Sequence, residues 1–318
     1  MNSELLDRIK NCKTLPAVPA LPLQVLQLCR REDADIKKLG DLISKDPTFV
    51  AKALNIANSS FYGGARHEVT TVTQAITLLG MNSIATLAFC FSLYRDLRRH
   101  GGSGFNHAQF WQRSILASVA GRTLGVWSGA IECEEIFLAA LLQDIGILVL
   151  SETHAETYGD LMAKSEGSHA RLEELERQQI GADHTEVGAW LAENWKLPEL
   201  LQSAIRGSHD PTQVKVPDEA QKMIRCVVTS GRLADVWCDP QTEQATHEAA
   251  KAAQEFLQMD SNDLITVLTK ISDGFLEMST LFQMDLGNAK EIQSTLEIAT
   301  KHLQSLSPSE PPQPASVS

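Results

Sequence analysis

The residues best suited to chemistry are one aspartate inside an apolar segment and two histidines further along the chain. Asp144 lies within the apolar run 141–150. An isolated buried carboxylate is costly, so Asp144 must be paired, capped or coordinated. It can accept hydrogen bonds from a neighbouring backbone or from Arg113, or it can bind a metal ion. His184 and His209 lie near expected helix ends, where each can act as a local capping or loop residue or as a metal ligand.

Other motifs that carry chemistry are absent from the sequence. It contains no Gly-x-x-x-x-Gly-Lys-Ser/Thr phosphate loop, no Gly-x-Gly-x-x-Gly after a strand and no Gly-x-Ser-x-Gly elbow. The six cysteines are scattered without a Cys-x-x-Cys pair, so a zinc ribbon or a thiol redox motif is unsupported. The one basic cluster, at residues 95–100, is typical of a solvated helix end, with an anion site as the alternative.

The net charge of the chain restricts the classes of partner that it can bind. The formal net charge is −12, whereas binding to nucleic acid or to anionic lipid needs a basic surface. Residues 1–13 are charged and lack the apolar core of a signal peptide. No apolar stretch approaches the roughly 20 residues that span a bilayer. We therefore expect a cytoplasmic protein that neither binds nucleic acid nor inserts into a membrane.

The elements that must position these residues are helices, because apolar residues recur at helical spacing and no alternating strand pattern is present. Asp46-Pro47 predicts a helix start, with aspartate as the cap and proline in the first turn. The run 136–150 is predicted as one buried helix and 172–179 as an exposed, charged helix. Further helices are expected over 21–30, 36–45, 72–93 with a break at Gly80, 109–124, 199–206, 222–236 and, as two helices, 245–305.

A series of short motifs runs in order through residues 12–237. The first are Leu15-Pro16 with Pro19, Asp46-Pro47, Asn58-Ser59, Tyr62, Ala75-Ile76 and Leu79-Gly80. The later ones are Phe110-Trp111-x-x-Ser114, Ala139-x-Leu141-Leu142-x-Asp144-Ile145-Gly146, Asp183-His184-x-x-Val187-Gly188-Ala189-Trp190-Leu191, Trp195-x-Leu197-Pro198 and Ile205-x-x-x-His209. Together they resemble the HDOD domain, the HD-related output domain, and their shared order makes the resemblance specific.

The resemblance implies an all-α fold related to the HD and HD-GYP phosphohydrolases. Residues 1–100 would form an N-terminal helical lobe and residues 105–240 an HD-like helical bundle. The Gly-rich stretch 97–107 reads as a linker between these lobes. Residues 241–306 would add C-terminal helices, and the proline-rich tail 307–318 is expected to be disordered.

The enzymes of that lineage hold one or two metal ions, and this sequence departs from their ligand pattern. Arg113 falls near the first histidine, Gln143 replaces the histidine of the His-Asp pair, and Gly231 aligns with the late aspartate. Arginine has no lone pair to give, and at about 5 Å it repels a dication by roughly 6 to 7 kcal/mol at an effective dielectric of about 20. Asp144, His184 and His209 remain. We therefore expect no catalytic residues, no bound metal and no cofactor, with Arg113 paired to Asp144.

The function implied is that of a non-catalytic bacterial signalling protein that acts through protein–protein contacts. The resemblance links such proteins to cyclic-di-GMP signalling, motility or gene regulation, with GGDEF-type and other output proteins as candidate partners. Helix 292–303 is a candidate signalling helix or homodimer contact, unless it packs on the second lobe. The alternatives are a residual metal-dependent phosphohydrolase and a ligand sensor that uses the old pocket.

Overall fold

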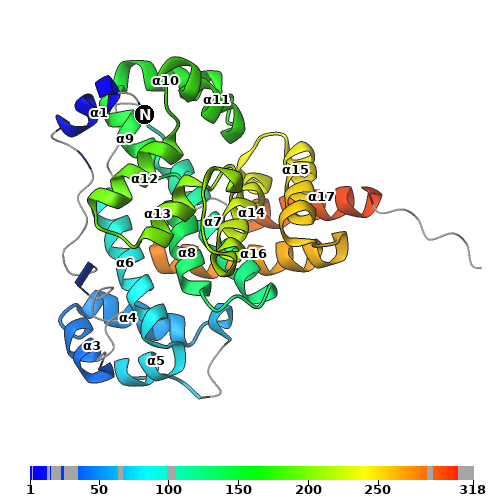
Figure 1. Cartoon of the computed structure of the whole chain (residues 1–318). Coiled ribbons are helices and arrows are strands. Elements are labelled where there is room, and N and C mark those ends of the chain that lie inside the picture. The colour runs from blue at the N-terminus through cyan, green and yellow to red at the C-terminus, as the bar shows by residue number, and fades with distance from the viewer. Residues whose placement is uncertain are drawn as a thin grey trace, which may run out of the picture.

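The computed structural model describes residues 1, 3–12, 15, 23–24, 35–63, 67–98, 105–284 and 289–306 (Figure 1). Every regular element in these ranges is helical, so the fold is all-α, as expected. The predicted helix at 21–30, apart from two residues, the glycines of the predicted linker and the tail 307–318 lie outside the described residues.

Four consecutive helices form a group whose first three lie at the base of the molecule in Figure 1, while the fourth runs upward from them. They are α3 (Ile36–Ile43), α4 (Pro47–Ala57), α5 (Val72–Leu79) and α6 (Met81–Leu97), with the short η1 (Ser60–Tyr62) after α4. Helix α4 begins as predicted, because the Asp46 side chain accepts hydrogen bonds from the backbone N–H groups of Thr48 and Phe49. Helices α5 and α6 meet at Gly80, whose φ of 85° is in the left-handed region that favours glycine.

A larger bundle follows. It comprises α7 (His107–Trp127), α8 (Cys133–Leu142), α9 (Ile145–Thr153), α10 (Ala155–Lys164), α11 (His169–Gln179), α12 (His184–Asn194), α13 (Glu199–Arg206), η2 (Pro211–Gln213) and α14 (Asp218–Cys238). Helix α7 packs against α8 and α14 and is buried over most of its length. The prediction of one helix over 136–150 is wrong, because the chain turns at Gln143 and Asp144 between α8 and α9. That turn frees the Asp144 side chain for partners outside its own helix.

The C-terminal helices are α15 (Thr242–Leu257), α16 (Ser261–Phe282) and α17 (Ala289–Leu306). Helix α16 packs on α7 and also reaches α4. Helix α17 packs on α15 and α16 and buries Ile292, Ala299 and Leu303. The indole Nε1 of Trp237, on α14, donates a hydrogen bond to the Ile292 carbonyl at 3.1 Å. The buried apolar residues of α17 thus pack within its own chain, on α14 as well as on α15 and α16.

The first helix lies apart from the group at the base. Helix α1 (Ser3–Lys10) packs against α9, with Leu5 and Ile9 buried (Figure 1). This contact joins the start of the predicted N-terminal lobe to the larger bundle. Within the described ranges no single helix is long and apolar enough to cross a membrane, although α5 and α6, bent by 111°, meet that test as a pair.

Candidate functional site

A close crossing of two helices creates the site. A Cβ atom at Gly146, on α9, would lie 2.0 Å from the His184 carbonyl oxygen at the start of α12. Only a glycine permits this approach, since real Cβ contacts are never so short. The Asp183 side chain caps α12 by accepting hydrogen bonds from the backbone N–H groups of Thr185 and Glu186. The crossing and the cap together set His184 beside Asp144.

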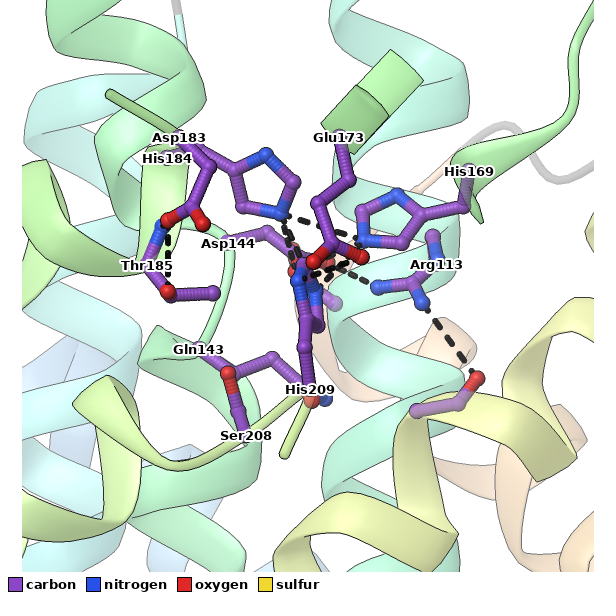
Figure 2. A network of polar contacts seen from close by, with 12 residues as sticks. Arg113, Gln143, Asp144, His169, Glu173, Asp183, His184, Thr185, Ser208 and His209 are labelled. Carbon is purple, nitrogen blue, oxygen red and sulfur yellow. Dashed lines mark hydrogen bonds and ion pairs between the residues drawn. The ribbon is translucent and has the colours of Figure 1, made fainter. Parts of the chain in front are cut away.

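Three imidazoles converge on this point. The Nε2 atoms of His169, His184 and His209 are each 3.2 Å from the other two. The Asp144 Oδ1 atom lies 3.4 Å from Nε2 of His169 and 3.6 Å from Nε2 of His184. Figure 2 shows the rings pointing their nitrogens toward one another, from α11, from α12 and from the loop after α13. We call these four residues the histidine–aspartate cluster, and their donor atoms all lie within 4.8 Å of one another.

Two glutamates of α11 orient the rings from behind. His184 Nδ1 is 2.6 Å from Glu176 Oε2, and His209 Nδ1 is 2.9 Å from Glu173 Oε2. Tyr158 donates a further hydrogen bond to Glu176. The prediction that 172–179 is an exposed helix is therefore wrong on this face, because both glutamates are buried. Their hydrogen bonds to histidine compensate for the loss of water.

Arg113 closes the other side of the site. Its guanidinium forms an ion pair with Asp144 Oδ2 and a second one, at 2.8 Å, with Asp235 Oδ1. The predicted pairing of Arg113 with Asp144 is thereby confirmed. Gly231 contributes only its carbonyl oxygen, at 3.3 Å from Arg113 Nη2. Gln143 packs where a side chain at position 231 would lie, 2.8 Å from the expected Cβ, so the two substituted positions fill each other's space.

The charges of the site shift its pKa values in opposite directions. Burial and then the Arg113 charge lower the pKa of His169 to about 4. Burial also opposes a charge on His184, but Glu176 outweighs it and raises the pKa of His184 to about 9. Burial would raise the pKa of Asp144, yet Arg113 and then His169 hold it well below its usual value. Asp144 is thus a carboxylate, and His169 is neutral with a lone pair to offer.

A cavity of about 220 Å³ lies next to the cluster. Arg113, Asp144 and His169 form part of its polar end, and Phe110 and Ile147 are among its apolar walls. A small molecule in this cavity would contact the guanidinium and the cluster directly. The arrangement can therefore bind an ion, a small ligand, or both.

Comparison with known families agrees with the motifs. The model of the HDOD domain matches residues 15–211, more than half of the chain. The chain belongs to the HDOD family. The matched range contains Arg113, Asp144 and every member of the histidine–aspartate cluster.

Solved structures share this HDOD fold at low sequence identity. An HDOD domain protein of unknown function from Geobacter sulfurreducens superimposes with a TM-score of 0.68 at 19% identity, covering 89% of this chain and 96% of its own. A candidate phosphohydrolase from Shewanella amazonensis SB2B gives 0.60 at 22% identity, covering 96% and 98%. A candidate signal transduction protein from Marinobacter aquaeolei VT8 gives 0.58 at 20% identity, covering 88% and 65%.

A curated relative is a longer protein. An uncharacterised protein of Treponema pallidum (strain Nichols) is 22% identical over 226 residues, which is 71% of this chain and 42% of that relative. The chain thus spans less than half the length of the curated relative it matches.

The HDOD motifs contain some residues of this site, and the other residues lie outside them. Asp144, His184 and His209 do come together, as the resemblance implied. His169, Glu173 and Glu176 were missed, although their spacing of four and then three residues places them on one face of α11. Asp235 was missed because it lies one helical turn beyond Gly231, the position taken for the late aspartate. One signal in the sequence could have indicated that these residues are buried. The polar residues of α11 lie on a helix face that also carries Leu172, an apolar residue that is buried.

Proposed function

We propose that this HDOD protein is a non-catalytic signalling protein of bacteria that acts by binding other signalling proteins. The observation that carries the proposal is the position of Arg113. Its permanent charge lies where the enzyme pattern has a metal ligand, and it engages both Asp144 and Asp235. A two-metal hydrolytic centre needs those carboxylates to bridge and hold its ions. The Marinobacter structure described as a candidate signal transduction protein has the same fold, which supports the proposal by analogy.

The closed form of the cluster supports the same proposal. Hydrolytic single-metal sites keep three protein ligands and leave one position for water. Here four donors face a common centre, and three of them, Asp144, His169 and His184, are buried. A site filled by four protein ligands is of the structural kind.

Catalysis is tested with the full chain supplied with Mn²⁺, Fe²⁺ or Zn²⁺, with cyclic-di-GMP and bis(p-nitrophenyl) phosphate as substrates. We expect the turnover of the wild type to equal that of Asp144→Asn and of a no-protein blank. Metal-dependent turnover that Asp144→Asn abolishes would establish a phosphohydrolase instead. Affinity purification from the native cell then tests the partner, and we expect a signalling protein to co-purify in stoichiometric amount.

A second candidate function, a small-molecule sensor, is favoured by the cavity beside the cluster. Its volume of about 220 Å³ and its mixed apolar and charged walls suit a compact ligand. A ligand that binds the folded state raises the melting temperature. Thermal-shift screening with nucleotides and cyclic dinucleotides tests this function, and a response that survives Arg113→Met would place the ligand elsewhere.

A further inference from the structure

In the neutral form of its histidines, the histidine–aspartate cluster directs lone pairs, not protons, at its centre. The Nδ1 atoms of His184 and His209 face the carboxylates of Glu176 and Glu173. A carboxylate beside Nδ1 fixes the ring proton on that nitrogen and leaves the lone pair on Nε2. Nitrogens that meet at 3.2 Å with lone pairs directed at one another repel unless a positive charge lies between them.

The fourth member of the cluster offers a lone pair as well. Asp144 uses Oδ2 for Arg113, whereas its Oδ1 accepts no hydrogen bond of normal geometry among the described residues. That oxygen is buried and directed at the histidines, 3.4 Å from the nearest Nε2 atom. Buried carboxylate oxygens are normally satisfied, so an unsatisfied one beside the imidazoles of His169 and His184 points to a cation between them.

The buried charges around the cluster are net negative, and this balance favours a bound dication. Among the described residues, five buried carboxylates lie in the connected network, and two guanidinium groups pair with them. The carboxylates belong to Asp144, Glu173, Glu176, Asp183 and Asp235, and the guanidinium groups to Arg113 and Arg177. Three negative charges therefore remain uncompensated. One imidazolium would offset one of them, and a divalent ion would offset two.

We propose that Asp144, His169, His184 and His209 bind a single divalent transition-metal ion of the zinc class. Tetrahedral Zn²⁺ with bonds of 2.0–2.1 Å places its ligand atoms about 3.3 Å apart. Five of the six separations between the donors, 3.2 Å between nitrogens and 3.4 and 3.6 Å from the carboxylate oxygen, match that value, and the sixth, from Asp144 to His209, is within 4.8 Å. Imidazole with carboxylate suits Zn²⁺, Co²⁺ and Fe²⁺ rather than Mg²⁺ or Ca²⁺.

This metal site differs from the ligand set that the enzyme pattern implies. Of that set, the positions of Arg113, Gln143 and Gly231 take no part here, whereas Asp144, His184 and His209 are shared. His169 lies outside the motifs that resemble the family. The inference reverses the expectation from the sequence that no metal binds, because His169 and the two orienting glutamates were not recognised there.

A bound ion would join four separate segments of the chain. Its ligands come from the start of α9, from α11, from α12 and from the loop before η2. Helix α11 packs on α10, and its Glu176 and Arg177 side chains contact the start of α12. The metal would add a direct bond from α11, through His169, to the same region.

The test starts with the full chain, freed of metal by dipicolinate and then titrated with Co²⁺ and with Zn²⁺. We expect one equivalent of Co²⁺ to bind and to give the intense visible absorption of tetrahedral cobalt. One equivalent of Zn²⁺ should displace it, raise the melting temperature and slow amide hydrogen exchange in residues 169–179. Failure of the wild-type chain to bind either ion with one-to-one stoichiometry overturns the proposal and leaves a proton as the shared charge of the cluster.

Two matched variants locate the ion. His169→Gln should lower the affinity for Zn²⁺ by at least about 100-fold, since losing even an orienting partner of a ligand costs about 10–100-fold. His67→Gln, the same change at an exposed histidine far from the cluster, should bind as the wild type does. Unchanged affinity of His169→Gln would place the ion elsewhere and refute the assignment. If His169→Gln does not fold, Glu176→Gln serves in its place, with an expected loss of about 10–100-fold.

The metal site and the proposed function fail independently. A chain that binds Zn²⁺ and also hydrolyses a phosphodiester would retain the metal site and lose the non-catalytic proposal. A chain that binds no metal and has no turnover would refute the metal site and leave the non-catalytic proposal intact.

Discussion

Replacing Arg113 by methionine tests how the site is held together. The guanidinium is buried and makes ion pairs with Asp144 and Asp235 and a hydrogen bond to the Gly231 carbonyl. Methionine fills much of the same volume with no charge, so packing is largely kept. What it leaves behind is two buried carboxylates without a counter-ion.

Breaking a buried ion pair from one side costs about 3–5 kcal/mol. We therefore expect Arg113→Met to lower the free energy of unfolding by that amount. With a denaturant slope of about 3 kcal/mol per molar urea, the midpoint would fall by about 1 M or more. The measurement is urea unfolding followed by circular dichroism, with a chelator present so that metal does not contribute.

Two further variants make the result decisive. The triple variant Arg113→Met, Asp144→Asn, Asp235→Asn removes the stranded charges, and replacing a whole buried ion pair is often neutral, so most of the lost stability should return. Arg206→Met changes an exposed arginine on α13 and should stay within about 0.5 kcal/mol of the wild type. A midpoint for Arg113→Met equal to that of the wild type would refute the buried-network reasoning.

Three other predictions concern single positions. Gly146→Ala forces a Cβ atom to within 2.0 Å of the His184 carbonyl, so α9 and α12 must separate; we expect a loss of at least about 2 kcal/mol in urea unfolding. Burial raises the pKa of the Cys226 thiol to about 11, so iodoacetamide at pH 8 should leave Cys226 unmodified in the folded chain and label it in urea, as peptide mass spectrometry would reveal. Trp237→Phe removes the hydrogen bond to the Ile292 carbonyl and should cost about 1 kcal/mol by the same unfolding assay.

The fold was largely predictable from local signals in the sequence. Asp46-Pro47 and Gly80 carry their own capping and turn chemistry, and the structure has the expected boundaries there. The break at Gln143 and Asp144 was not predictable from periodicity, since the apolar residues on both sides are buried on every face. Apolar periodicity shows where a helix is buried, but it does not show where a continuously buried run bends.

The candidate site was only half predictable, for a different reason. His184 and Asp144 stood out because they fall inside recognisable motifs, whereas Glu173 and Glu176 lie in a segment whose charge is typical of an exposed helix. Burial of those glutamates depends on histidines from other helices, so it is a tertiary property. A sequence read one helix at a time assigns such residues to the surface.

Arg113 and the histidine–aspartate cluster share Asp144, and this sharing would allow the proposed ion to bind next to an arginine. A guanidinium forms planar, directional contacts and here engages the outer carboxylate oxygen, Oδ2. The other oxygen, Oδ1, remains directed at the imidazoles. Arg113 repels a dication, but the carboxylates of Glu173, Glu176 and Asp235 attract it. Arg113 can therefore take the place of one ion beside Asp144 and Asp235 while the neighbouring position still binds another. An arginine beside a cluster of metal-binding side chains excludes a metal only from the atoms that it contacts itself.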